Sequence, residues 1–105
     1  MEGQIAFKRQ RVTFPEVEDE PQFKEVWFHF PATVWTADCA INGFNIGFTR
    51  SDRELHWLNV DTHMGVIQNS SVKVRVDFGL RDKSGYYDDP YRGYVDVLVI
   101  AHCNE

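Results

Sequence analysis

The 105-residue sequence has little cysteine and no long apolar run. Two cysteines, Cys39 and Cys103, are too few for the disulfide framework that stabilises many small secreted domains. Both lie beside apolar segments, so we expect buried free thiols, with a single bridge between them left open. No apolar run approaches the roughly 20 residues that a membrane helix needs, and the first residues lack the layout of a signal peptide. We expect a soluble chain without a membrane insertion; its compartment stays unknown.

Basic residues are also scarce. Sixteen acidic residues against eleven basic ones give a formal charge of −5. This balance argues against a nucleic-acid partner, because binding to a phosphate backbone depends on excess positive charge. Hydrophobic residues make up 43% and charged residues 26% of the chain, a composition typical of a packed domain. The length predicts one domain over residues 1–105.

Motifs of nucleophilic and phosphate chemistry are missing. The chain has no G-x-S-x-G elbow, no supported Cys–His arrangement and no glycine-rich phosphate loop. A domain of this size also leaves little room for a deep cleft. We therefore expect a protein that is not an enzyme, although carboxylates that meet only in space stay open as an alternative.

Helix-favouring apolar residues are few, whereas strand-favouring ones are abundant. Twelve valines and eight phenylalanines stand against four leucines and five alanines. Valine loses side-chain freedom in a helix but packs well on a pleated surface. The composition predicts an all-β fold, an antiparallel two-sheet β-sandwich of six or seven strands with little or no helix.

Alternation of apolar and polar residues locates the strands. We expect strands over residues 4–14, 24–30, 33–49, 54–61, 71–80 and 94–102. Within 33–49, the dipeptide Asn42-Gly43 predicts a tight hairpin turn, because it tolerates positive φ angles. The acidic, proline-flanked segment 15–22 predicts an exposed loop.

Two of these strands carry large apolar residues on both faces. Trp27 shares a face with His29, opposite Phe28, and Leu98 and Ile100 lie opposite the valines of the last strand. An isolated sandwich leaves one face of each sheet in water, so exposed apolar faces favour coverage by a partner subunit. We expect a homo-oligomer.

The segment 81–93 concentrates aromatic and charged residues. Its candidate ligand-binding residues are Tyr87, Asp88, Asp89, Tyr91 and Arg92. Tyrosine offers an apolar face to a sugar ring, while Asp and Arg fix hydroxyl groups through charge-assisted hydrogen bonds. The alternative is a structural loop built from turn residues, in which the arginine only neutralises its neighbours.

Metal ligands do not form a recognised pattern. Asp82, Asp88 and Asp89 have oxygen atoms suited to calcium, but their spacing is not that of an EF-hand. His56 and His63 flank Asp61 without matching a common zinc signature. We expect no metal site and no cofactor, with calcium left as the open alternative. Residues 69–71 fit the glycosylation pattern, which short sequences also match by chance.

The region 26–101 resembles H-type lectin domains. The likeness is carried by the alternating segment 72–80, the polar aromatic segment 86–92 and the closing segment 94–101, YVDVLVIA. The resemblance implies a six- or seven-stranded sandwich that forms trimers, sometimes doubled into hexamers. It also implies shallow sites for galactose-type sugars near the subunit boundaries, with side chains supplied by the loop before the last strand.

Taken together, these features predict a non-catalytic, carbohydrate-binding, lectin-like module that acts as a multivalent homo-oligomer. Linked shallow sites raise apparent affinity without new contacts at any one of them. The alternative is a structural or interaction module that mediates assembly without binding sugar.

Overall fold

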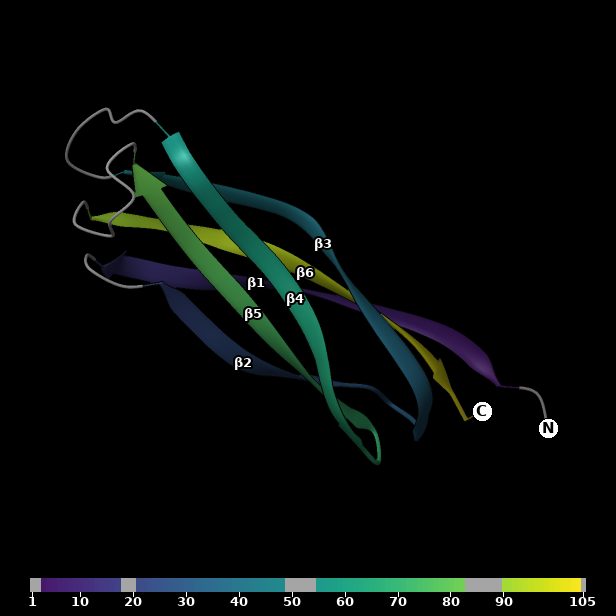
Figure 1. Ribbon diagram of the computed structural model, residues 1–105. Coiled ribbons are helices and arrows are strands. Elements are labelled where there is room, and N and C mark those ends of the chain that lie inside the picture. The colour runs from purple at the N-terminus through teal and green to yellow at the C-terminus, as the bar shows by residue number, and fades with distance from the viewer. Residues whose placement is uncertain (1–2, 18–20, 49–54, 83–89, 105) are drawn as a thin grey trace.

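The computed structural model describes residues 3–17, 21–48, 55–82 and 90–104. These residues form six strands: β1 (Gln4–Val17), β2 (Gln22–His29), β3 (Val34–Phe48), β4 (Leu55–Gln68), β5 (Ser71–Asp82) and β6 (Tyr91–Cys103). Two antiparallel three-stranded sheets result, with the strand orders β1-β6-β3 and β2-β5-β4 (Figure 1). The prediction of an all-β, two-sheet antiparallel sandwich is confirmed, with six strands.

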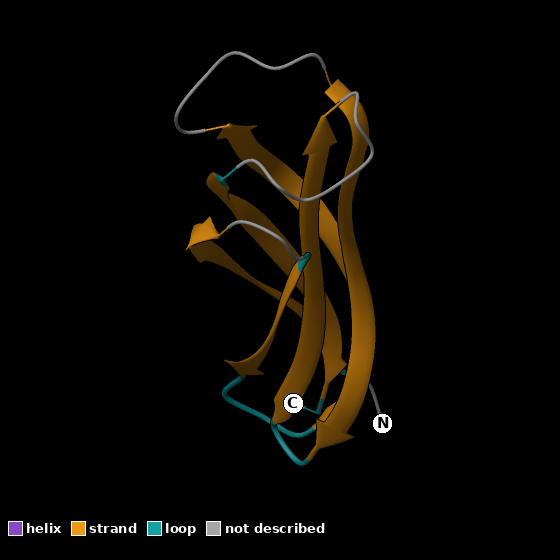
Figure 2. Cartoon of the chain, turned by 60° about the vertical axis from the view of Figure 1, so that its left-hand side comes forward, coloured by secondary structure: helices purple, strands orange, loops and turns teal. Residues whose placement is uncertain are grey.

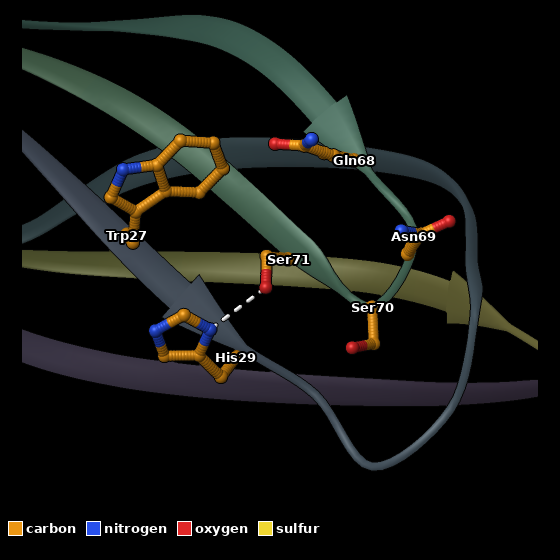
Figure 3. Close-up of a pocket in the computed structure, with 6 residues that line it drawn as sticks. All are labelled: Trp27, His29, Gln68, Asn69, Ser70 and Ser71. Atoms are coloured by element: carbon orange, nitrogen blue, oxygen red, sulfur yellow. Dashed lines mark hydrogen bonds between the residues drawn. The ribbon is translucent and has the colours of Figure 1, made fainter.

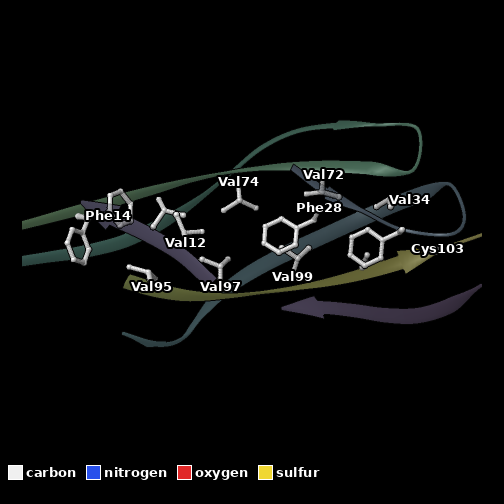
Figure 4. Close-up of a cluster of buried hydrophobic side chains, with 14 of the residues drawn as sticks. Val12, Phe14, Phe28, Val34, Val72, Val74, Val95, Val97, Val99 and Cys103 are labelled. Carbon is white, nitrogen blue, oxygen red and sulfur yellow. The ribbon is translucent and has the colours of Figure 1, made fainter. Parts of the chain in front are cut away.

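The core lies between the two sheets and comes mainly from their central strands. In β5 and β6 the alternate residues that face inward are buried, and six of them are valines. Figure 4 shows these side chains meeting between the layers: Val72 and Val74 from β5, and Val95, Val97 and Val99 from β6. Each such valine contributes on the order of 1.5–3 kcal/mol by leaving water. The alternation of apolar and polar residues therefore determines which face of each central strand is buried.

Aromatic packing closes the core at one end. The rings of Phe14 and Phe78 stack with their centroids 4.4 Å apart and an interplanar angle of 5°. Tyr91 packs against Phe78 at 5.9 Å between centroids. Gly93 lies beside this cluster, where a Cβ would overlap the backbone carbonyl oxygen of Asn45. Only glycine lets β3 and β6 approach this closely.

The hairpin predicted at Asn42-Gly43 is wrong. β3 runs without a break across this dipeptide and pairs with β6 along almost its whole length. Ile41 pairs with Val97 and Gly43 with Asp96, so Asn42 is the extra residue of a β-bulge. Asn42-Gly43 tolerates the unusual backbone angles of both a turn and a bulge. The bulge forms because β3 pairs with the long strand β6 on both sides of this dipeptide.

Strand lengths also differ from the sequence predictions. Segment 15–22 is not a loop throughout, since β1 continues to Val17 with an irregular register after Phe14, and β2 already begins at Gln22. β4 continues to Gln68, well beyond the predicted end at residue 61. Strand pairing supplies backbone hydrogen bonds that override weak local patterns.

The two cysteines are free thiols. Cys103 is buried at the end of β6, and Cys39 is partly buried in β3. Their strand positions differ, because Cys39 pairs with Val99 whereas Cys103 pairs with Gln4 and Val34. Among the described residues, no helix has the length and apolar character that crossing a membrane requires.

Candidate binding site

A shallow polar and aromatic hollow lies on the outer face of the β2-β5-β4 sheet, where the β4–β5 hairpin turns. It has a volume of about 340 Å³. Figure 3 shows the six side chains that line it: Trp27, His29, Gln68, Asn69, Ser70 and Ser71. We call this set the Trp27 hollow.

Strand register brings the two rings of the hollow to the same face. In β2, Phe28 points into the core, so its neighbours Trp27 and His29 point outward. β2 pairs with β5 so that Trp27 stands opposite Lys73 and His29 opposite Ser71. The indole keeps 38% of its surface exposed, which leaves it free to contact a ligand.

The hairpin turn supplies the polar groups. Gln68 pairs with Ser71, so Asn69 and Ser70 form a two-residue loop. Asn69 has a φ of 55°, a left-handed conformation that asparagine adopts more readily than most residues. The turn therefore depends on the identity of this residue.

Two backbone hydrogen bonds fix the turn to the β2–β3 connection. The Phe30 N–H donates to the Ser70 carbonyl at 2.8 Å, and the Val34 N–H donates to the Asn69 carbonyl at 2.9 Å. Both donors belong to residues whose side chains are buried. The hollow is thus built on a turn that the core holds in place, a rigid support for a binding site.

The lining is polar, and none of its described residues is a carboxylate, lysine or arginine. His29 Nδ1 and Ser71 Oγ share a hydrogen bond of 2.8 Å, drawn in Figure 3, which orients the imidazole. The amides of Gln68 and Asn69 and the hydroxyls of Ser70 and Ser71 offer both donors and acceptors. The arrangement suits a neutral ligand that has many hydroxyl groups and one apolar face.

Charged residues continue along the same outer face and are paired with one another. Lys73 Nζ lies 2.8 Å from Glu25 Oε2 and 5.8 Å from the centre of the Trp27 ring. Arg75 Nε lies 3.0 Å from Asp77 Oδ1. These pairs make the outer face of the β2-β5-β4 sheet a hydrated surface around the hollow.

A histidine between two carboxylates lies further along this face. His63 Nε2 is 3.0 Å from Asp77 Oδ2 and 3.3 Å from Asp61 Oδ2. His56, which flanks Asp61 in the sequence together with His63, also lies on β4, and its side chain is outside the described part. Within the described residues, no three His, Cys, Asp or Glu side chains come together as metal ligands would.

The predicted site in segment 81–93 needs a correction at Tyr91. This side chain is fully buried, packs against Phe78 and donates a hydrogen bond from its hydroxyl to the Phe78 carbonyl at 3.3 Å. Its ring therefore belongs to the core and is not available to stack on a sugar. The sequence pattern assigns Tyr91 to the loop, whereas this residue begins the closing strand, β6, whose odd-numbered residues face inward.

The other predicted ligand residues are not gathered into a described site. Arg92 is exposed on β6 and stands opposite Gly47, whereas Tyr87, Asp88 and Asp89 lie outside the described residues, as does the aspartate-rich calcium alternative at 88–89. β5 leads from the Trp27 hollow to Asp82 at the far end of a molecule 55 Å long. The β4–β5 turn beside the hollow and the C-terminal end of β5 thus lie at opposite ends of the sandwich (Figure 1).

A larger hollow, of about 480 Å³, lies on the outer face of the other sheet. Its lining is dominated by the apolar side chains Phe7, Leu98 and Ile100, with Lys8, Arg9 and Asn42 at its border. Among these described residues there is no tryptophan, and Asn42 is the one side chain with an amide or hydroxyl group. Lys8 and Arg9 offer a sugar only cationic donors there, whereas the amide and hydroxyl side chains of the Trp27 hollow offer both donors and acceptors.

Sequence reasoning found part of the Trp27 hollow without recognising it as a site. Alternation already placed Trp27 and His29 on one face, and residues 69–71 stood out only as a glycosylation pattern. The missing information was that β2 pairs with β5 and that the turn lies against residues 30–34. Both contacts join segments that are distant in the sequence, and no local pattern reveals them.

Comparison of the chain with protein-family models, with curated proteins and with solved structures returned no match. What the site does has to be inferred from its own residues and geometry.

Proposed function

We propose that this protein is a non-catalytic carbohydrate-binding module and that the Trp27 hollow is its sugar site. One observation supports the proposal above all. A part-exposed indole lies beside a hydrogen-bonded His29–Ser71 pair and the amide and hydroxyl side chains of the hairpin turn, all in one shallow hollow. A sugar ring needs an apolar surface for its C–H face and a border of directional hydrogen bonds for its hydroxyls.

The site's shallowness has a consequence for affinity. An open hollow of about 340 Å³ holds one sugar ring and leaves much of it in water, so each site binds weakly. Association of several copies raises the apparent affinity by linking the sites. The proposal therefore includes a homo-oligomer, as the apolar outer surfaces also suggest.

An array of immobilised oligosaccharides tests the proposal directly. Wild-type protein is expected to bind a subset of glycans, and Trp27→Ala to lower that binding at least tenfold with the circular dichroism spectrum unchanged. Phe23→Ala is the matched control, because Phe23 is an exposed aromatic residue on the same strand and the same outer face but does not line the hollow. A blank array with wild-type protein, or equal losses in both variants, contradicts the proposal.

A second function has support from a different observation. Large apolar side chains are exposed on the outer face of the β1-β6-β3 sheet, as assembly surfaces require. A module that assembles without binding sugar gives a blank glycan array together with a stable oligomer.

A further inference from the structure

The outer faces of the two sheets differ in character. On the β2-β5-β4 sheet, the face around the Trp27 hollow carries paired charges: Lys73 with Glu25, and Asp77 with Arg75 and His63. Paired charges hold water and are costly to bury. Phe23 is exposed on this face as well, but the Arg75 guanidinium lies over its ring, 4.2 Å from the centre. This face is suited to solvent and to a polar ligand.

The outer face of the β1-β6-β3 sheet carries a cluster of large apolar side chains on β1 and β6. Phe7 pairs with Ile100 across β1 and β6, and Ile5 and Leu98 lie beside them on the same face. We call these four residues the apolar strip. Phe7 has 69% of its surface exposed, and Ile5 and Ile100 are exposed as well. A row of large apolar side chains in water favours a partner that covers it.

Charges of both signs border the apolar strip. Arg9 pairs with Leu98 on one side, and Asp38 pairs with Ile100 on the other. Arg11 makes two hydrogen bonds to Asp96, at 2.8 and 3.1 Å. A surface that meets its own copy needs both signs on one patch, and Arg9 and Asp38 lie on opposite sides of the strip, where each can face the other residue on a second copy. The charge pattern therefore selects a second copy of this chain.

The size of the face fits such a contact. β6 has 13 residues, and at about 3.4 Å per residue and about 4.8 Å between strands the three-stranded face covers roughly 600 Å² in plan. Stable complexes bury about 800 Å² per partner, measured on accessible surface that includes the relief of side chains. The area of one sheet face is thus of the same order as the area that each partner buries in a stable complex.

We propose that two copies associate through the outer faces of their β1-β6-β3 sheets, so that the two apolar strips cover each other. The two sheets form separate layers (Figure 2), and the Trp27 hollow lies on the outer face of the β2-β5-β4 layer, so the two hollows then point away from each other. A dimer with sugar sites on opposite faces links two glycan-bearing surfaces, and this part of the inference rests on the proposed function. The contact itself does not depend on sugar.

Native mass in solution tests the contact. Light scattering over a concentration series is expected to give twice the chain mass of 12.3 kDa for the wild type and the mass of a single chain for Phe7→Glu. The matched control is Phe23→Glu, which places the same charge on the outer face of the other sheet, where Phe23 is 55% exposed. Ile100→Glu is a second variant, and circular dichroism verifies that each variant is folded.

Three results overturn the contact: a monomeric wild type, a wild-type mass of three chains, or a dimer that stays paired in both Phe7→Glu and Ile100→Glu. The glycan array separates this proposal from the proposed function. A dimeric protein that binds no glycan overturns sugar binding and leaves the contact in place. A monomeric protein that binds glycan overturns the contact and leaves sugar binding at the Trp27 hollow in place. Where both hold, glycan-coated beads clump with the wild type and not with Phe7→Glu.

Discussion

His29 Nδ1 lies 2.8 Å from the hydroxyl oxygen of Ser71, across the β2–β5 pair. The hydrogen bond holds the imidazole against the sheet next to the exposed Trp27 ring. Two residues 42 positions apart in sequence thereby form one binding surface. The proposed site is a product of strand register.

This pair gives the first prediction. His29→Ala removes a directional hydrogen-bonding group from the hollow and is expected to weaken glycan binding about tenfold, the effect of losing one hydrogen bond of about 1.4 kcal/mol. Ser71→Ala leaves the ring in place but unanchored, so a smaller loss is expected. Binding is measured on the array glycan that wild type holds most strongly. His63→Ala, on the same face outside the hollow, serves as control and retains full binding.

Substitutions of Tyr91 distinguish a structural role in the core from a role in ligand binding. Tyr91→Phe keeps the ring and removes the hydroxyl that donates to the Phe78 carbonyl, and it is expected to cost about 0.5–1.5 kcal/mol of unfolding free energy. Tyr91→Ala removes a fully buried ring and is expected to cost about 3–5 kcal/mol. Urea unfolding measures both. If Tyr91→Ala has wild-type stability but has lost glycan binding, Tyr91 belongs to the binding site and not to the core.

The hairpin turn depends on the left-handed conformation of Asn69. Asn69→Gly is expected to keep wild-type stability within a few tenths of a kcal/mol, because glycine adopts a φ of 55° without strain. Asn69→Val is expected to lose about 1–2 kcal/mol, since a β-branched residue is strained there. Thermal unfolding of the two variants provides the comparison. Equal stability of both would show that the turn tolerates any residue.

The Arg11–Asp96 pair predicts a pH dependence. Hydrogen bonds from the Arg11 guanidinium lower the pKa of Asp96 below its ordinary value of 3.8, and the same bonds raise the pKa of Arg11. A carboxyl group with a lowered pKa in the folded state stabilises the fold above its ordinary pKa. That contribution is lost as the pH falls through the lowered value.

Asp96→Asn tests this dependence. Wild type is expected to unfold at a higher urea concentration than Asp96→Asn at pH 7, and the two midpoints are expected to converge as the pH falls from about 4 towards 2. Asp38→Asn, on the same outer face and without an ion pair to Arg11, is the control. A constant difference between wild type and Asp96→Asn across this range would contradict the assignment.

The strongest sequence signals marked the core correctly. Strict alternation in residues 72–80 and the valines at 95, 97 and 99 predicted which side chains are buried, and all of them lie between the sheets. Burial of one face is so favourable for these residues that few arrangements compete with it. The outward positions of Leu98 and Ile100 followed from the same alternation.

Weaker signals failed where a local preference permits two structures. Asn42-Gly43 suits a turn and a bulge alike, and the pairing partner β6 decided between them. Tyr91 looked like a loop residue among charged neighbours, but it begins a strand whose inward register buries it. Local sequence carries no information on which distant strand will supply the missing hydrogen bonds.

The sequence by itself determined the all-β class and the inward face of each central strand, because the pleat has a period of two residues and the apolar residues at alternate positions are stabilised by burial. Only the tertiary structure decided which strands are neighbours, and hence that Trp27 and His29 meet the turn at Asn69 while Phe7 meets Ile100. Those contacts join residues far apart along the chain, where chain entropy and register, rather than local preference, set the outcome.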